Sequence, residues 1–296
     1  MKNYLIISLL FLSLGFSQEE YNIDHIMERD SVYYKKFSDE KVNGNVYQMF
    51  DDMKVDIGKL KDGKKHGLWT EWYENGQKKG DGIFKDGKPD GLLTTWYENG
   101  QKKHEGNFKD GIPGGLGIVW YENGQKKYEG NFKDGVPDGL GIRWYENGQK
   151  EYEGTWKDDK KDGLFTYWYE NGQKSGKGTF KNGKDDGLVI RWYENGQEKV
   201  ESYWKNGKPH GLSIDYHENG QKYKEKTFKD GELDGLWTEW YENGQKRFEG
   251  TYKDRGLDGL GIMWYENGQK KIEKTFKDGK PISEKCWDED GNKCEC

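Results

Sequence analysis

The side chains that usually carry catalysis or bind metal ions form no recognisable motif in this chain. The three cysteines all lie within the last eleven of the 296 residues, and the five histidines are scattered. No Ser-His-Asp, Cys-His, HExxH or phosphate-loop pattern is present. The Asp-Gly loops, and the acidic segment from Asp288 to Asn292, lack the alternating ligands and the distal glutamate of an EF-hand. We therefore expect no catalytic residue, no cofactor, no metal site and no enzymatic activity.

The residues with the most suggestive spacing are aromatic. The stretch Trp72–Lys79 (WYENGQKK) recurs with a constant period, in nine copies and with no insertion between them. Its first position is occupied in turn by Trp72, Trp96, Trp120, Trp144, Trp168, Trp192, Tyr216, Trp240 and Trp264. Such a ladder could stack sugar rings, or seat a lipid or a peptide. Position-for-position regularity is also what the core of a repeat array needs, and we interpret the ladder as structural.

The composition favours an extended folded array. Only 31% of the residues are hydrophobic and the mean hydropathy is −1.21, values that alone would indicate disorder. However, 15% are aromatic, and these lie at fixed positions of the repeat. The net charge is −6, with 48 basic and 54 acidic residues closely interleaved. This balance argues against nucleic acid as a partner, because proteins that bind it usually present a basic face.

Residues 1–17 have the features of a secretory signal peptide. Lys2 precedes an apolar run, residues 4–16, and Gly15 and Ser17 are small residues that fit a cleavage site before Gln18. The run is shorter than the roughly 20 residues that cross a bilayer, and no later segment is apolar enough to do so. We expect an exported protein without a transmembrane segment, in the periplasm, in the cell envelope or outside the cell.

Each copy consists of two predicted strands. In the first copy these are residues 68–73 and 78–85, which are rich in aromatic and β-branched side chains. Asn75-Gly76 between them tolerates positive φ and predicts a hairpin turn. The segment Lys85–Gly91 leads to the next copy, and its Asp-Gly pairs and proline predict a loop that interrupts strand pairing.

The turn leaves two registers open. A two-residue type I′ turn would pair Glu74 with Gln77, whereas a three-residue loop with a glycine bulge would pair Tyr73 with Gln77. We favour the three-residue loop, because the side-chain faces then agree across all nine copies. In this register the tryptophans share one aromatic face with side chains such as Leu68 and Phe84. The opposite face, with its tyrosine, lysine and glutamate rows, is predicted to be solvated.

The copies differ mainly within single rows of the predicted solvated face. Trp69, Phe165 and Trp237 are bulky there, whereas Gly117 and Gly141 at equivalent positions carry no side chain. Gly261 is equally bare. We expect any binding specificity to lie where the copies disagree.

Both ends of the array depart from the regular repeat. Residues 18–43 form a charged N-terminal segment, in which only residues 31–34 resemble a strand. Residues 44–66 are predicted to be a degenerate copy that caps the open sheet edge, with Asp51-Asp52 in place of the Asn-Gly turn. Nine regular copies then occupy residues 67–282.

The chain ends in a shortened hairpin, residues 283–296, that carries the three cysteines. If its turn has the three-residue form, Cys286 faces Cys294. An oxidising compartment permits a disulfide between them. We predict this bond as an end staple, with Cys296 as a free thiol.

The pattern Gly-Leu-x-x-x-Trp-Tyr-Glu-Asn-Gly-Gln-Lys-Lys…Phe-Lys-Asp-Gly-Lys-x-Asp-Gly resembles the MORN repeat, in the variant form of the bacterial YwqK-family antitoxin repeat. The resemblance covers roughly residues 44–285. It implies an all-β fold, an elongated antiparallel sheet of tandem 24-residue β-hairpin repeats, and a scaffold for protein or lipid contact. No catalytic residues come with the motif. Aromatic cell-wall-binding repeats are also built of hairpins, but their period and aromatic pattern differ from those of this chain.

We predict an exported, non-catalytic repeat scaffold that mediates contact with an unidentified protein partner or with an envelope surface. One alternative is an antitoxin-like inhibitor of a protein partner. It conflicts with the signal peptide, because an antitoxin neutralises its toxin in the cytoplasm. The other alternative is capture of a glycan or a lipid along the aromatic face.

Overall fold

The computed structural model of the protein describes residues 19–254 and 256–295. Most of these residues belong to β-strands, and their helical content is a short 3-10 turn, η1 (Ile23–His25). No helix in the described part of the chain is long and apolar enough to cross a membrane. The predicted signal peptide, residues 1–17, lies outside the described residues and stays a prediction.

The chain divides into two compact units, Met1–Gly100 with Phe108–Gly111, and Gln101–Asn107 with Ile112–Cys296. The strands of the first unit are β1 (Glu20–Asn22), β2 (Ile26–Arg29), β3 (Val32–Lys35), β4 (Gly44–Phe50), β5 (Met53–Lys61), β6 (Lys64–Trp72), β7 (Lys78–Lys85) and β8 (Lys88–Trp96). β9 (Lys102–Lys109) has residues in both units. The strands of the second unit are β10 (Ile112–Trp120), β11 (Lys126–Lys133), β12 (Val136–Trp144), β13 (Lys150–Lys157), β14 (Lys160–Trp168), β15 (Lys174–Lys181), β16 (Lys184–Trp192), β17 (Glu198–Lys205), β18 (Lys208–Tyr216), β19 (Lys222–Lys229), β20 (Glu232–Trp240), β21 (Lys246–Lys253), β22 (Gly256–Trp264), β23 (Lys270–Lys277), β24 (Lys280–Trp287) and β25 (Lys293–Cys294).

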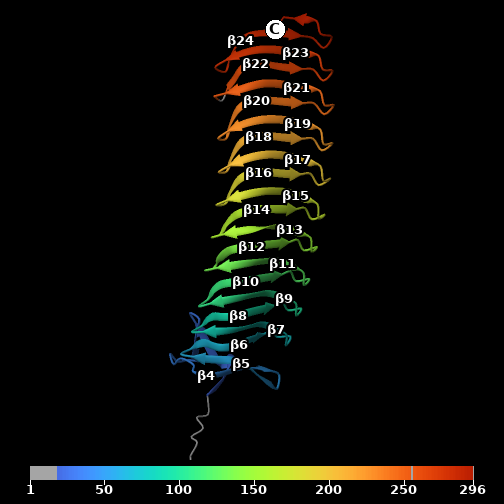
Figure 1. Cartoon of the computed structure of the whole chain (residues 1–296). Coiled ribbons are helices and arrows are strands. Elements are labelled where there is room, and N and C mark those ends of the chain that lie inside the picture. Colours follow the sequence, from blue (N-terminus) through green and yellow to red (C-terminus); the bar gives the residue numbers. More distant parts are fainter. Residues whose placement is uncertain (1–18, 255, 296) are drawn as a thin grey trace, which may run out of the picture. The chain divides into compact units, whose positions relative to one another are not determined.

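Within each unit the strands pair with their neighbours in the sequence (Figure 1). β4 to β8 pair antiparallel in chain order, and so do β10 to β25. β1 pairs in parallel with β4, and β2 with β3 forms a separate hairpin. Each 24-residue copy contributes one hairpin, so the predicted all-β fold of tandem antiparallel hairpins is confirmed.

The turn within each copy has the three-residue form. The Tyr73 N–H donates to the carbonyl oxygen of Gln77 (2.8 Å), and the Gly76 N–H donates to the carbonyl oxygen of Tyr73 (3.0 Å). Trp72 pairs with Lys78. The Asn75 side chain closes the loop by accepting from the Gln77 N–H (3.0 Å). The favoured register is therefore confirmed at the turn.

The predicted faces are wrong beyond the turn, because each hairpin contains one extra residue. Trp72 pairs with Lys78, but Glu71 pairs with Gly80, so Lys79 is a β-bulge. A bulge shifts the alternation of side chains on one strand by one position. Phe84 consequently lies on the opposite face from Trp72.

Burial follows the shifted faces. Leu68, expected on the buried aromatic face, is 62% exposed, whereas Trp69, expected in the solvated row, is 2% exposed. Phe165, which is equivalent to Trp69, is completely buried. We call the face that carries the ladder tryptophans the Trp face; in the first copy it comprises Leu68, Thr70, Trp72, Lys78 and Asp81. We call the other the Phe face; in the first copy it comprises Trp69, Glu71, Gly80, Gly82 and Phe84.

The link between copies is tighter than predicted. Within Lys85–Gly91 the turn consists of two residues, Asp86 and Gly87, with φ of 50° and 82°. Both values suit a type I′ turn, where aspartate and glycine are tolerated. Strand pairing resumes at once, with Phe84 opposite Pro89, and the irregularity is a bulge that follows within β8. The expectation that this whole segment interrupts the pairing is therefore wrong.

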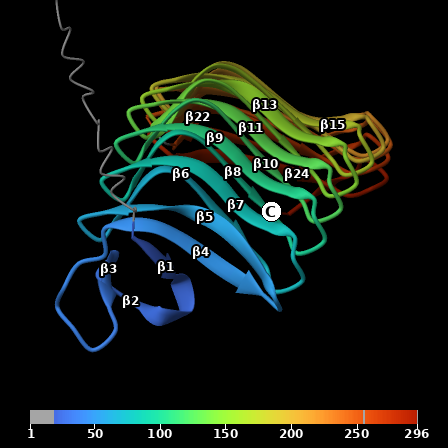
Figure 2. The ribbon, with the colours of Figure 1, turned by 90° about the horizontal axis from the view of Figure 1, so that it is seen from below.

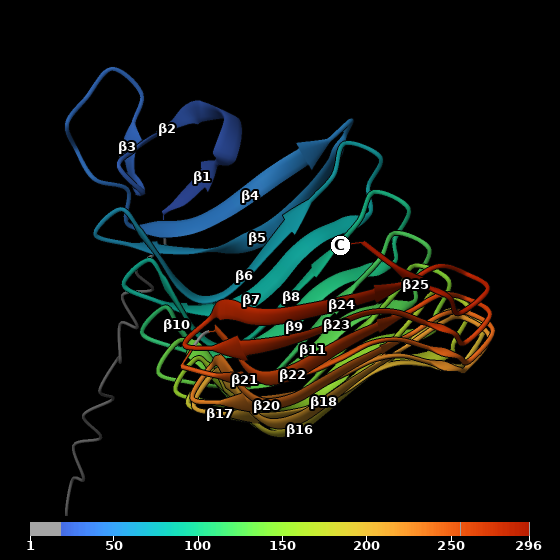
Figure 3. The ribbon, with the colours of Figure 1, turned by 90° about the horizontal axis from the view of Figure 1, so that it is seen from above.

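The N-terminal segment folds onto the first hairpins. β1 to β3 lie on the concave side of β4 to β6 (Figures 2 and 3). Their hydrophobic side chains join those of β4 to β6 in one buried cluster, composed of Ile26, Tyr33, Val42, Val46, Ile57, Leu60 and Trp69. The Tyr33 and Trp69 ring centroids are 6.2 Å apart. In this unit the start of the Phe face is thus covered by the chain's own N-terminal residues.

The repeated tyrosine, predicted to face water, connects one copy to the next. The Tyr73 hydroxyl is partly buried and donates to the Trp96 carbonyl oxygen (2.8 Å). The Asn75 amide donates to the Glu98 carbonyl oxygen of the same neighbouring copy (3.0 Å). In the second unit the same bond joins Tyr145 to Trp168. The Tyr-Glu-Asn-Gly motif therefore fastens consecutive turns together.

The final hairpin has the turn on which the cysteine prediction depends. The Asp288 N–H donates to the Asn292 carbonyl oxygen (2.9 Å), and Cys286 pairs with Cys294. The Cys286 Sγ donates to the Cys294 carbonyl oxygen at 3.0 Å. The two cysteines face each other across the hairpin. The disulfide itself stays a prediction, and Cys296 lies outside the described residues.

The tyrosine bond can be tested by removing one hydroxyl. We expect Tyr145→Phe to lower the local unfolding free energy by about 1 kcal/mol, because the Trp168 carbonyl loses its partner. Hydrogen exchange of the amides in β13 and β14 measures this locally, as suits a repeat array. The matched control is Tyr203→Phe, whose exposed hydroxyl makes no hydrogen bond within the described residues. Equal effects of the two substitutions would contradict the proposed role.

The end staple can be tested by counting thiols. Denatured, non-reduced protein from an oxidising compartment is expected to show one free thiol, and mass spectrometry should find Cys286 linked to Cys294. The variant Cys296→Ser should then show none. Three free thiols in the unsubstituted protein would rule the staple out.

Candidate interaction surface

The Trp face repeats one arrangement of three side chains. In the first copy, Lys78 Nζ lies 5.9 Å from the Trp72 ring centroid and 5.7 Å from that of Trp96. It also lies 2.8 Å from Asp81 Oδ2. A lysine that covers an aromatic ring is attracted to its π face, and the carboxylate holds the lysine in place. Each copy of this kind satisfies its own charges.

The same arrangement recurs in the second unit. Lys150 Nζ lies 2.5 Å from Glu153 Oε2 and 5.6 Å from the Trp168 centroid. Equivalent ion pairs are Lys102–Glu105, Lys126–Glu129, Lys222–Glu225, Lys246–Glu249 and Lys270–Glu273. The ladder tryptophans are half-buried, and lysines cover most of their rings. This geometry supports the structural interpretation of the ladder, although its rings are not the most buried ones.

The Phe face has a floor of small residues on which larger side chains lie. Phe165 pairs directly with Gly154, where an added Cβ would stand 2.3 Å from the Phe165 ring. Only glycine permits this close approach. At Gly117 and its partner Gly130, neither residue has a side chain. The Phe132 ring lies over Gly117 instead. The aromatic packing of this face thus changes from copy to copy.

The first large group on the Phe face of the second unit surrounds Phe165. Its rings, which we call the Phe165 cluster, belong to Tyr152, Trp156, Phe165, Tyr167 and Phe180, with centroids 5.3–6.5 Å from that of Phe165. Lys161 Nζ lies 5.0–5.1 Å from three of these rings and donates to the Tyr167 hydroxyl (2.6 Å). Burial raises the pKa of the Tyr152 hydroxyl.

The second group surrounds Trp237 and borders a hollow of about 380 Å³. Phe248 and Tyr252 lie 5.7 and 5.2 Å from the Trp237 ring. Glu239, which also lines the hollow, lies 3.2 Å from Lys224 Nζ. Burial, and then the charge of Glu239, raise the pKa of Tyr252. The Trp237 Nε1–H is buried and has no hydrogen-bond partner among the described residues.

The positions of the Phe face differ between copies far more than those of the Trp face. One row runs through Glu71, Thr95, Val119, Arg143, Tyr167, Arg191, Asp215, Glu239 and Met263. The sequence analysis did not single out this row, although it placed the neighbouring variable row, that of Trp69, Phe165 and Trp237, on the same face. The variability of the row was itself a usable signal.

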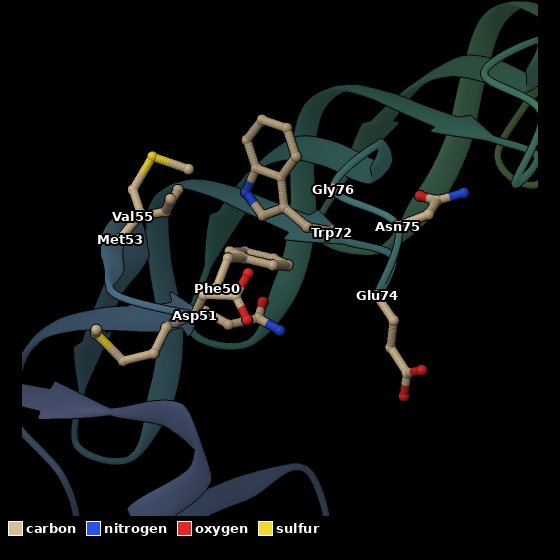
Figure 4. Close-up of a pocket in the computed structure, with 10 residues that line it drawn as sticks. Phe50, Asp51, Met53, Val55, Trp72, Glu74, Asn75 and Gly76 are labelled. Carbon is tan, nitrogen blue, oxygen red and sulfur yellow. The ribbon is translucent and has the colours of Figure 1, made fainter.

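A further hollow of about 520 Å³ lies on the Trp face at the N-terminal hairpin. Gln48 stands where a regular copy has its ladder tryptophan, one repeat period before Trp72. Phe50, Met53 and Trp72 line the space, whereas the Glu74 side chain points away from the sheet (Figure 4). The hollow follows from the missing ring of the degenerate copy.

Tandem hairpins with one uniform face and one variable face define a repeat scaffold for interaction with other molecules. The MORN repeat variant family matches residues 65–86, 89–110, 113–134, 161–182, 185–206, 209–230, 233–254 and 257–278. The MORN repeat itself matches residues 128–150 and 201–212. These matches cover more than half of the chain, which belongs to the MORN repeat variant family.

The comparison with curated proteins gave no match. Among solved structures, the chain is similar to those titled "Crystal Structure of TcdB2-TccC3" (9% identity, TM-score 0.20), "Crystal Structure of TcdB2-TccC3-TEV" (8%, 0.19) and "Crystal Structure of TcdB2-TccC3-Cdc42" (10%, 0.20). The alignments cover 85%, 84% and 83% of this chain and 16%, 15% and 17% of those chains. The chain thus spans about a sixth of their length.

The face assignment predicts opposite results for two neighbouring residues. We expect Phe165→Ala to destabilise its hairpin by about 3–5 kcal/mol, because it empties a buried site. Leu164→Ala, on the Trp face and 50% exposed, should cost less than about 1 kcal/mol. Hydrogen exchange of the amides in β13 to β15 measures both. A larger loss of stability for Leu164→Ala than for Phe165→Ala would contradict this face assignment and favour the faces expected from the sequence.

Proposed function

We propose that the protein is an exported, non-catalytic scaffold that binds a protein partner through the Phe face of its second unit. The observation that carries this proposal is the contrast between the faces. Stacking favours the same side chains from copy to copy, and most copies supply them on the Trp face. Side chains that vary from copy to copy are free to serve recognition, and these gather on the Phe face.

The chemistry of the Phe face fits a folded protein partner with mixed charges. Tyrosine, tryptophan and arginine are the residues that most often dominate binding at protein interfaces, and this face presents all three. Its charges also change sign along the row, from Arg143 and Arg191 to Asp215 and Glu239. The hollow beside Trp237, which Phe248 and Leu257 also line, offers a site for an apolar side chain of the partner.

The signal-peptide features of residues 1–17 support export. The proposed location is therefore the periplasm, the cell envelope or the outside of the cell. An antitoxin-like inhibitor would use the same surface but bind one partner tightly in a one-to-one complex. Capture of a glycan or a lipid along the ladder is disfavoured, because lysines already cover most of the tryptophan rings.

The proposal can be tested with two substitutions in one strand. Met263, on the Phe face, and Leu260, on the Trp face, are 46% and 48% exposed and both belong to β22. In pull-downs from the envelope fraction, Met263→Lys should weaken capture of a specific partner at least tenfold. Leu260→Lys should leave it unchanged.

The outcome also separates the alternatives. Capture that survives Met263→Lys and is lost with Leu260→Lys would move the binding surface to the Trp face and contradict the proposal. A single partner retained at one-to-one stoichiometry would favour the inhibitor. Quenching of tryptophan fluorescence by envelope glycans or liposomes would favour ligand capture.

A further inference from the structure

Two neighbouring copies break the charge pattern of the Trp face. Where seven copies have a lysine and an acidic residue, the fifth copy has Lys174 and Lys177. The sixth copy has Glu198 and Glu201 at the same two positions. One copy thus carries two cations, and the next carries two anions.

These four charges have no ion-pair partner in the part of the chain that the structure describes. In residues 19–254 and 256–295, none of the four lies within ion-pair distance of an opposite charge. Lys174, Lys177 and Glu198 are exposed, and Glu201 is half-buried. Like charges placed side by side on a sheet are unfavourable. The stability of the hairpins therefore does not explain why one copy has two lysines and the next has two glutamates at these positions.

The strand register places the two pairs symmetrically about β16. Lys177 lies opposite Ile190, and Ile190 lies opposite Glu201 on its other side. The cations and the anions are therefore roughly 10 Å apart, two strand spacings, with β16 halfway between them. Trp192 of β16 lies directly opposite Glu198. No lysine covers the Trp192 ring in the described chain, in contrast to the ring of Trp168.

The ladder residue Tyr216 also lies near the anionic pair. This residue replaces the ladder tryptophan that follows Trp192. Burial, and then the nearby charges of Glu198 and Glu201, raise the pKa of its hydroxyl. The anionic pair is thus close to an aromatic ring that no lysine covers in the described residues.

A second copy of the chain can be generated by a two-fold rotation about an axis that runs parallel to β16, just above the Trp face. The rotation places the cations of one copy against the anions of the other. The rotation turns the sheet over and reverses the order of the strands, but it keeps each position along a strand. Lys174 then meets the Glu198 position, and Lys177 meets the Glu201 position. The surface is complementary to itself, as an isologous interface requires.

We infer that this part of the Trp face binds a second copy of the chain in a two-fold dimer. Lys174 and Lys177 of each protomer pair with Glu198 and Glu201 of the other, which gives four ion pairs. Trp192 and Ile190 lie on the axis and contact their own counterparts. Exposed leucines flank them, Leu164 on one side and Leu212 on the other. Together they supply the apolar surface that such an interface buries.

The test exchanges charges and measures mass. An acidic variant, Lys174→Glu with Lys177→Glu, and a basic variant, Glu198→Lys with Glu201→Lys, should each be monomeric by light scattering. The exported wild-type chain should have the mass of a dimer at low salt and dissociate as salt screens the pairs. The equimolar mixture of the two variants should form a one-to-one dimer, because every pair is then restored. The chain with all four substitutions should dimerise with itself.

The mixture is its own folding control, since unfolded variants could not recover the dimer. A wild-type chain that stays monomeric at every soluble concentration would overturn the inference. So would variants that dimerise alone, or a mixture that stays monomeric. Leu236→Glu, an exposed change outside the pairs on the same face, should leave the dimer intact. Partner capture through the Phe face is a separate measurement, so either proposal can fail without the other.

Discussion

One extra residue per hairpin decides which side chains share a face of the sheet. After Trp72 pairs with Lys78, the bulge at Lys79 shifts the alternation on the second strand, and every later residue of that strand changes sides. The shift leaves tryptophan with lysine and carboxylate on one face, and phenylalanine with glycine on the other. Because the turn and its bulge recur in each copy, the two faces stay distinct along each unit.

The division between faces separates stacking from recognition. Consecutive copies are fastened by the tyrosine hydroxyl, the asparagine amide and the lysine that covers the next ring, as Tyr145 and Lys150 illustrate. All of these contacts involve the turn or the Trp face, so the Phe face can vary without loosening the array. The glycine floor accepts rings of different sizes, and the Phe165 cluster and the Trp237 hollow are two results. The Trp face departs from its own pattern at Lys174 with Lys177 and at Glu198 with Glu201, and the proposed dimer rests on these four charges.

The period and the Asn-Gly turns were sufficient to predict the hairpins. The three-residue turn, on which the pairing of Cys286 with Cys294 depends, is confirmed, although it was favoured for an agreement of side-chain faces that the bulge overturns. The faces could not be predicted, because both sides carry aromatic residues and the bulge leaves no mark in the polarity pattern. Leu68 resembles a core residue and Trp69 an outlier, yet their burial is the reverse. Of the N-terminal strands, only β3 was anticipated, by residues 31–34, whereas β1 and β2 were missed. Their few apolar side chains, such as Ile26, are dispersed among charges and become a core only through contact with distant hairpins.

Hydroxyl-radical footprinting of adjacent residues tests the central claim, that the bulge places phenylalanine and tryptophan on opposite faces. Leu164 and Phe165 are 50% and 0% exposed and are consecutive in β14. We expect mass spectrometry to find Leu164 oxidised and Phe165 protected in the folded protein, with both oxidised after denaturation. Protection of Leu164 together with oxidation of Phe165 in the folded protein would contradict the account.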